Sequence, residues 1–125
     1  LRDLAASPED LGRLARRLEE PTVWDGFIAL LEGDGLEMPE DDGEARRESL
    51  LRMAREPERA HLFAVAERLL DHDEGFAPWR YHHALMVERE IGAKSGTGGS
   101  SGVEYLRSTL HKRFFPELWG LRSYL

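Results

Sequence analysis

The sequence predicts an all-α protein, a helical bundle, and three observations support this. Apolar residues recur at spacings of three and four along most of the chain, as on one face of a helix. Capping residues and prolines stand at the ends of these periodic segments. No segment of useful length alternates apolar and polar residues as a strand would. With 125 residues, the chain is expected to form a single domain over residues 1–125.

The first two helices are marked at both ends. Residues 7–10 (Ser-Pro-Glu-Asp) combine an N-cap serine, a proline at the first helical position and acids in the first turn. We expect this helix to run to Glu20, where Pro21 stops it. Thr22 is expected to cap a second helix, which ends at the Gly-Asp-Gly turn of residues 33–35.

Two further helices follow a polar loop. The third is expected over about residues 44–55, and Pro57 is expected to start the fourth. The fourth continues in this prediction to Ile91, with a kink where Gly75 and Pro78 interrupt it.

The last helical segment opens with a capping-box pattern. Ser101 is placed at the N-cap and Glu104 at the third helical position. This predicts a helix from Val103 that Pro116 breaks, followed by a short final turn.

Composition excludes several classes of protein and of site. A net charge of -7 argues against nucleic-acid binding, which needs a basic face. No apolar run approaches the roughly 20 residues of a membrane span. The chain has no cysteine, which excludes disulfides, thiolate zinc sites, iron–sulfur clusters and a cysteine-ligated haem, and which fits a reducing cytoplasm. The first residue, Leu1, indicates a fragment or a processed chain.

His83 is a candidate ligand. On a helix it shares a stripe with Trp79, Met86 and Val87, whereas His82 faces a more mixed surface, so we expect His83 to point inward. A lone inward histidine is more often a hydrogen-bonded core residue than a ligand. No second histidine follows at the i+4 position, so a zinc site is poorly supported. A haem needs only one protein ligand on its proximal face, and this pattern is compatible with one.

Residues 93–102, called the Gly/Ser loop below, allow two interpretations. Residues 94–102 hold four glycines, three serines and one threonine. Lys94 precedes the glycines and position 101 is serine, so neither phosphate-binding glycine motif fits. The composition favours a flexible linker. The helix that ends at Gly92 and the capping pattern at Ser101 favour instead a short lid over a ligand held at His83.

Five motifs lie between position 79 and the end of the chain: Trp79-Arg80-Tyr81-His82-His83, Met86-Val87-Glu88-Arg89, Ile91-Gly92-x-Lys94-x-Gly96-Thr97-Gly98-Gly99-x-x-Gly102, Tyr105-Leu106-Arg107 and Phe115-Pro116-Glu117-Leu118-Trp119-x-x-Arg122. Together they closely resemble the C-terminal part of the tryptophan 2,3-dioxygenase family. Over residues 11–77, helix pattern and loop order agree more than identities do.

The resemblance implies an all-helical, cytoplasmic homotetramer that depends on haem b. Such an enzyme inserts both atoms of O2 across the indole C2–C3 bond of L-tryptophan and gives N-formylkynurenine, in the kynurenine pathway of tryptophan catabolism. The resemblance makes His83 the proximal haem-iron ligand and places Trp79 on the proximal side of the haem. It makes Thr97, with Gly96 and Gly98, the substrate contact of the Gly/Ser loop, which then closes over substrate.

The resemblance also implies that this chain is only the C-terminal half of a domain. The family's N-terminal half supplies the distal histidine, the arginine that grips the substrate carboxylate and the aromatic wall around the indole. No catalytic residue is therefore assigned in this chain, and the N-terminal half is an expected partner, as another polypeptide or as a part lost by cleavage. Two alternatives stay open. One is a haem monooxygenase of the same superfamily that acts on an indole or phenol amino acid, and the other is a non-catalytic helical interaction module.

Overall fold

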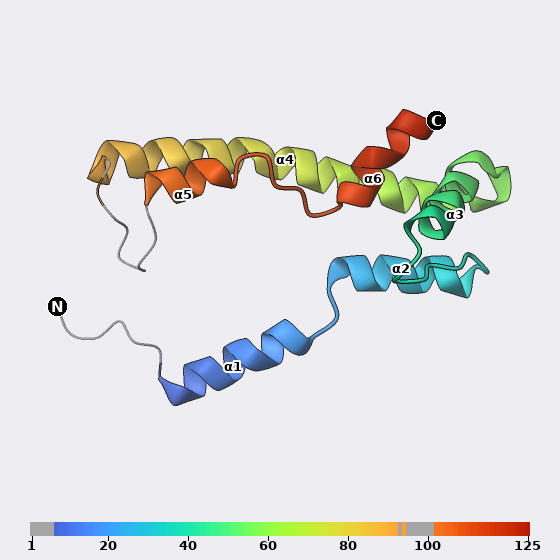
Figure 1. The fold of residues 1–125 in the computed structure, drawn as a ribbon, viewed down its shortest axis with the longest axis horizontal. Helices are drawn as coiled ribbons and strands as arrows, with labels where there is room; N and C mark the ends of the chain where they lie inside the picture. The colour runs from blue at the N-terminus through green and yellow to red at the C-terminus, as the bar shows by residue number, and fades with distance from the viewer. Residues whose placement is uncertain (1–6, 93, 95–101) are drawn as a thin grey trace. The chain divides into compact units, whose positions relative to one another are not determined.

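The computed structural model describes residues 7–92, 94 and 102–125, and within these ranges it contains helices and loops but no strand (Figure 1). The all-α prediction is therefore confirmed. The helices, in order, are α1 (Pro8–Glu19), α2 (Val23–Gly33), α3 (Gly43–Arg55), the 3-10 helix η1 (Pro57–Arg59), α4 (Ala60–Ile91), α5 (Val103–Ser108), α6 (Pro116–Leu121) and the 3-10 helix η2 (Arg122–Tyr124). None of the described helices is long and apolar enough to cross a membrane.

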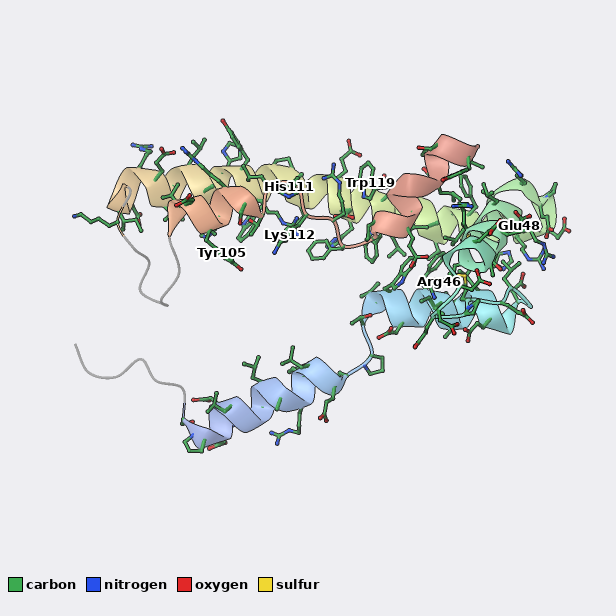
Figure 2. The ribbon with its side chains drawn as sticks, in the orientation of Figure 1. Arg46, Glu48, Tyr105, His111, Lys112 and Trp119 are labelled. Atoms are coloured by element: carbon green, nitrogen blue, oxygen red, sulfur yellow. The ribbon has the colours of Figure 1, made fainter. Side chains whose placement is uncertain are left out.

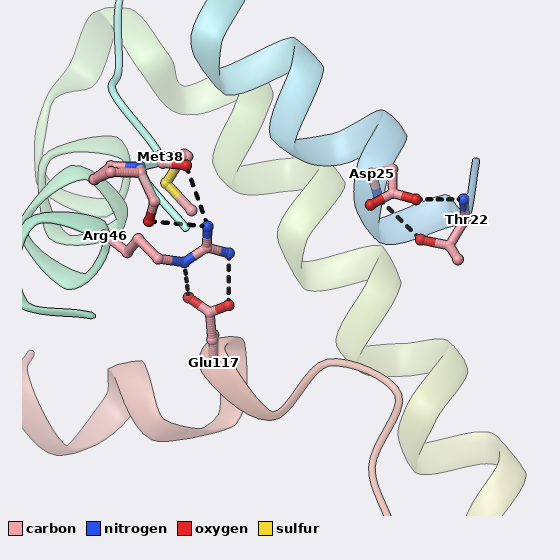
Figure 3. A network of polar contacts seen from close by, with 6 residues as sticks. Thr22, Asp25, Met38, Arg46 and Glu117 are labelled. Carbon is pink, nitrogen blue, oxygen red and sulfur yellow. Dashed lines mark hydrogen bonds and ion pairs between the residues drawn. The ribbon is translucent and has the colours of Figure 1, made fainter. Parts of the chain in front are cut away.

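The chain divides into two compact units, Leu1–Leu36 and Glu37–Leu125. In the first unit, both predicted N-caps are confirmed. The Ser7 hydroxyl accepts the backbone N–H of Asp10 at 3.1 Å, and the Asp10 carboxylate accepts the N–H of Ser7 at 3.2 Å. Thr22 and Asp25 make the same reciprocal pair at the start of α2 (Figure 3). Hydrogen bonding of the Asp25 carboxylate to the backbone N–H and the side chain of Thr22 holds the pKa of Asp25 below its ordinary value.

The second unit contains a core shared by α3, α4 and α6. α5 runs back alongside α4 in the opposite direction (Figure 1). Burying these apolar side chains is the main stabilising contribution available to a domain of this size. The buried side chains of these helices include Leu50, Leu51 and Met53 of α3, Leu62, Ala66 and Ala84 of α4, Val103 of α5, and Leu118 and Leu121 of α6.

α4 runs unbroken for 32 residues. A 3-10 turn that begins at Pro57 precedes it, and the helix then passes through Gly75 and Pro78 as far as Ile91, as the sequence predicts. Pro78 has no N–H, so the carbonyl of Glu74 lacks its usual helical partner. The kink expected there stays a prediction.

The capping box predicted for α5 is wrong. The N-cap is Gly102, and no side chain caps the helix, while Ser101 lies outside the described residues. Gly102 has φ +66 and ψ -122, a backbone conformation that glycine adopts at little steric cost. With Gly102 at the N-cap, Glu104 moves to the second helical position, where its side chain cannot complete the box. The predicted first helical residue, Val103, is confirmed.

α5 is also shorter than predicted, because it ends at Ser108 rather than near Pro116. The connection between α5 and α6 is irregular, and side chains of α4 bind its backbone. Arg80 donates to the carbonyls of Thr109 and Lys112. Asp73 accepts backbone N–H groups from further along the connection. These bonds replace the helical ones that a longer α5 would make.

An ion pair joins α3 to α6 (Figure 3). The Arg46 guanidinium donates to both carboxylate oxygens of Glu117, at 3.0 and 2.7 Å. It also donates to the backbone carbonyls of Met38 at 3.2 Å and Pro39 at 3.4 Å. The Arg46 side chain is only 11% exposed, whereas that of Arg52 in the Arg52–Glu56 pair is 46% exposed, so the charge of Arg46 is the more shielded from water.

Replacing Arg46 with alanine is expected to lower the free energy of unfolding by about 1–3 kcal/mol, because Glu117 and two carbonyls lose a charged donor. Arg52→Ala is the matched control, since its 2.9 Å pair with Glu56 lies on α3 with the arginine 46% exposed. That change should cost no more than about 0.5 kcal/mol. Urea denaturation followed by circular dichroism measures both values, and equal losses would contradict the assignment.

Candidate functional site

Trp79 and His83 lie one helical turn apart on α4, and their side chains stack. The ring centroids are 5.0 Å apart and the ring planes differ by 12°. The Trp79 side chain is 56% exposed, while His83 is half-buried. The structure thus brings together the two α4 residues that the sequence selects.

His83 lies at the boundary between two surfaces of α4. Ala84 is buried and Val87 is half-buried on one side of it. On the other side, Trp79 and Met86 are large apolar side chains that are half or more exposed. In a chain with 33% charged residues, such a strip of exposed apolar side chains indicates a binding surface.

The His83 imidazole makes no hydrogen bond to any other residue that the structure describes. This does not match a hydrogen-bonded core histidine, and the side chain is only half-buried. A neutral imidazole has one ring nitrogen with a free electron pair, which suits haem iron. A histidine that makes no hydrogen bond to another described residue, beside a flat aromatic ring and an exposed apolar strip, therefore fits the proximal side of a haem. Within the described ranges, no group of three or more His, Asp or Glu side chains could hold a metal ion by itself.

His82 is exposed, and it faces a more mixed surface of α4, as predicted. It lines a groove of about 470 Å³ together with Leu85, Met86, Arg89 and Glu90. This lining mixes apolar and charged groups and lacks the stacked aromatic partner that His83 has.

A continuous row of aromatic rings extends from His83 along α4. Phe76 lies 5.0 Å from Trp79, and Phe114 lies 5.2 Å from Phe76 in an edge-on arrangement. The ring of His72 lies 5.6 Å from that of Phe114. We call the rings of Phe114, Phe76, Trp79 and His83 the aromatic row. Each contact of this kind contributes about 0.5–1.5 kcal/mol beyond the burial of its area.

Asp73, which sequence reasoning missed, is a buried carboxylate that is only 2% exposed. It accepts the N–H groups of Phe114 and Phe115 at 3.0 Å each and the indole N–H of Trp119 at 2.9 Å. Trp119, labelled in Figure 2, belongs to α6, so one side chain of α4 holds both α6 and the connection that leads to it.

The position of Asp73 around the axis of α4 could have identified it from the sequence as a buried carboxylate. At 100° per residue it falls on the same side of α4 as the buried Leu62, Ala66 and Ala84. An aspartate on a buried stripe needs hydrogen-bond donors.

Opposing effects act on the pKa of Asp73. Burial raises the pKa, but the N–H groups of Phe114, Trp119 and Phe115, together with the charge of Arg113, outweigh burial. The net result is a pKa below the ordinary 3.8 of an aspartate. The carboxylate is therefore ionised at neutral pH.

The described residues on either side of the Gly/Ser loop are held together by an ion pair. Arg107 of α5 donates to both carboxylate oxygens of Glu88 in α4, at 2.6 Å each. Gly92, which precedes the loop, and Gly102, its last residue, both have positive φ values, +59 and +66. The predicted substrate contact, Thr97, lies outside the described residues together with its neighbours Gly96 and Gly98.

The chain matches known proteins over most of its length. The family model for tryptophan 2,3-dioxygenase matches residues 46–125. A tryptophan 2,3-dioxygenase from a Nocardioides species is 48% identical over 121 residues, which cover 95% of this chain and 44% of the relative. The tryptophan 2,3-dioxygenase of Herpetosiphon aurantiacus is 43% identical, and the match covers 98% of this chain and 50% of the relative. The tryptophan 2,3-dioxygenase of Caulobacter vibrioides is 42% identical, and the match covers 94% of this chain and 49% of the relative.

The chain spans about half the length of the curated relatives that it matches. The family model covers well over half of the chain and includes α4, α5 and α6. This chain therefore belongs to the tryptophan 2,3-dioxygenase family.

Proposed function

We propose that this chain is the haem-binding half of a tryptophan 2,3-dioxygenase. The complete enzyme inserts both atoms of O2 across the indole C2–C3 bond of L-tryptophan and gives N-formylkynurenine. The observation that supports this most strongly is His83, which stacks on Trp79 and makes no hydrogen bond to another described residue, in a chain of this family. The family assignment favours the dioxygenase over both a monooxygenase and a non-catalytic module.

The other half of the family's length is the proposed partner. This chain contains about half of a complete relative, and no residue in it is assigned to the distal side of the haem. We call this chain together with that other half the assembled enzyme. The homotetramer and the cytoplasmic location are likewise proposals that rest on the family.

His83 and Trp79 have separate tasks in this proposal. Haem b, when bound, supplies the iron that binds and activates O2. His83 would hold that iron through one of its ring nitrogens. Trp79 lies flat against the imidazole, limits its rotation and keeps water from that face.

The Gly/Ser loop has the task of holding the substrate. The Thr97 hydroxyl is proposed to bind the ammonium and carboxylate groups of L-tryptophan. Gly96 and Gly98 carry no Cβ, so the backbone beside Thr97 can approach a ligand closely.

Thr97→Ala is expected to raise KM for L-tryptophan roughly tenfold, since a hydrogen bond to a charged group contributes about 1.5–3 kcal/mol. The haem absorption spectrum should stay as in the wild type. Thr97→Ser keeps a hydroxyl and serves as the control, with KM within about twofold of the wild type. Steady-state kinetics of the assembled enzyme measures the effect, and an unchanged KM in Thr97→Ala would rule out the contact.

The reaction itself is tested by the mass of the product. The assembled enzyme is incubated with L-tryptophan and 18O2, and the product is expected to carry two labelled oxygen atoms. One labelled atom would identify a monooxygenase instead. A chain that binds no haem and converts no tryptophan in the presence of the other half would support the non-catalytic module.

A further inference from the structure

Asp73 also fixes the backbone of a residue whose ring belongs to the aromatic row. Of the described residues, only Ser49 and Asp73 are both polar and buried. One of the N–H groups bound by Asp73 belongs to Phe114, whose ring is a member of the aromatic row. The carboxylate therefore fixes the backbone from which that ring projects.

Arg80 also contacts the ring of Phe114. Its guanidinium lies over the rings of Phe76 and Phe114, 5.2 and 4.9 Å from their centroids. It also donates to the carbonyls of Thr109 and Lys112, in the connection that precedes Phe114. The Phe114 ring is thus held between a backbone anchored by Asp73 and a cation anchored to the same connection.

The rings of the aromatic row contact one another in order from Phe114 to His83. Phe114 contacts Phe76 at 5.2 Å, Phe76 contacts Trp79 at 5.0 Å, and Trp79 stacks on His83 at 5.0 Å. Metal-binding histidines usually take their orientation from a hydrogen bond to the second ring nitrogen. No other described residue hydrogen-bonds to His83, and the contact that the described residues do provide to its imidazole is the stacked ring of Trp79.

We propose that Asp73 is a positioning residue for His83, which acts by fixing Phe114 and through it the aromatic row that sets the plane of the imidazole. The inference rests on the proposed role of His83 as haem-iron ligand. Asp73 lies ten residues before His83 on α4, about 15 Å along the axis, and so acts through other side chains.

The test compares three variants in the assembled, haem-loaded enzyme. Asp73→Asn removes the charge that anchors the connection. Phe114→Leu keeps the backbone N–H that Asp73 accepts and removes only the ring. Asp71→Asn is the matched control, because Asp71 is an exposed carboxylate of the same helix, paired with Arg68 at 3.7 Å.

Two readouts separate positioning from stability. The iron–histidine stretching band of the ferrous enzyme, measured by resonance Raman spectroscopy, reports the orientation of the ligand ring. Titration of the haem-free protein with haem gives the Kd. We expect Asp73→Asn and Phe114→Leu to shift or broaden the band and to weaken haem binding roughly three- to tenfold. Asp71→Asn should match the wild type in both.

A wild-type band in both Asp73→Asn and Phe114→Leu would overturn the inference, even if both variants were less stable. If Asp73→Asn fails to fold, Phe114→Leu decides alone, since it leaves the bonds to Asp73 in place. Failure of the proposed function would look different, because the wild-type enzyme itself would then lack an iron–histidine band.

Discussion

Replacing His83 with alanine is expected to abolish haem binding on α4 and the oxygenase activity of the assembled enzyme. Loss of an outer partner of a metal ligand already costs about 10–100-fold in affinity or activity, and loss of the ligand itself should exceed the upper value. The haem absorption spectrum and the rate of tryptophan consumption measure the two effects.

His82→Ala is the matched control for this prediction. His82 is the next residue of α4 and is exposed on the groove side, without the stacked tryptophan that His83 has. This variant should keep both the haem spectrum and most of the activity. If instead the spectrum is lost in His82→Ala and kept in His83→Ala, the two histidines have been assigned the wrong way round.

Asp73→Ala is expected to lower the free energy of unfolding by about 3–5 kcal/mol, the largest stability effect predicted here. The change leaves two backbone N–H groups and the indole N–H of Trp119 without an acceptor, at a site that is 2% exposed. Urea denaturation followed by circular dichroism gives the value. The exposed Asp71→Ala should change it by less than about 0.5 kcal/mol.

The contribution of Asp73 should also depend on pH. Its pKa in the folded chain lies below the ordinary 3.8, so the folded state holds the ionised form more tightly than the unfolded state does. The stabilisation is therefore fully present above about pH 4 and declines as the pH falls through the folded pKa. The stability gap between the wild type and Asp73→Ala should narrow in acid, and a gap that stays constant down to about pH 2 would contradict this.

The helices predicted most accurately were those with local signals at both ends. Ser7 and Thr22 cap α1 and α2 through residues three positions away, so a single stretch of sequence contains the whole interaction. The Ser101 pattern at α5 has the same form but fails, because the N-cap is Gly102, one residue later, with a positive φ. A pattern of side chains does not reveal which backbone conformation a glycine takes.

The candidate site was predictable in part. The spacing of Trp79 and His83 on one helix was enough to predict that they share a face. Asp73 was missed because its donors lie 41–46 residues away, in an irregular connection that no periodicity describes. The hydrogen bonding of His83 could not be predicted from the sequence because it depends on the folded chain, and its role as haem ligand stays a prediction.

The central claim is that His83 holds the haem iron. Its most direct test is the resonance Raman spectrum of the ferrous, haem-loaded assembled enzyme in the variant His83→Gly. If His83 holds the iron, the iron–histidine band of the wild type disappears in this variant, and a similar band returns when free imidazole is added. A band that persists in His83→Gly without imidazole would show that another histidine binds the iron.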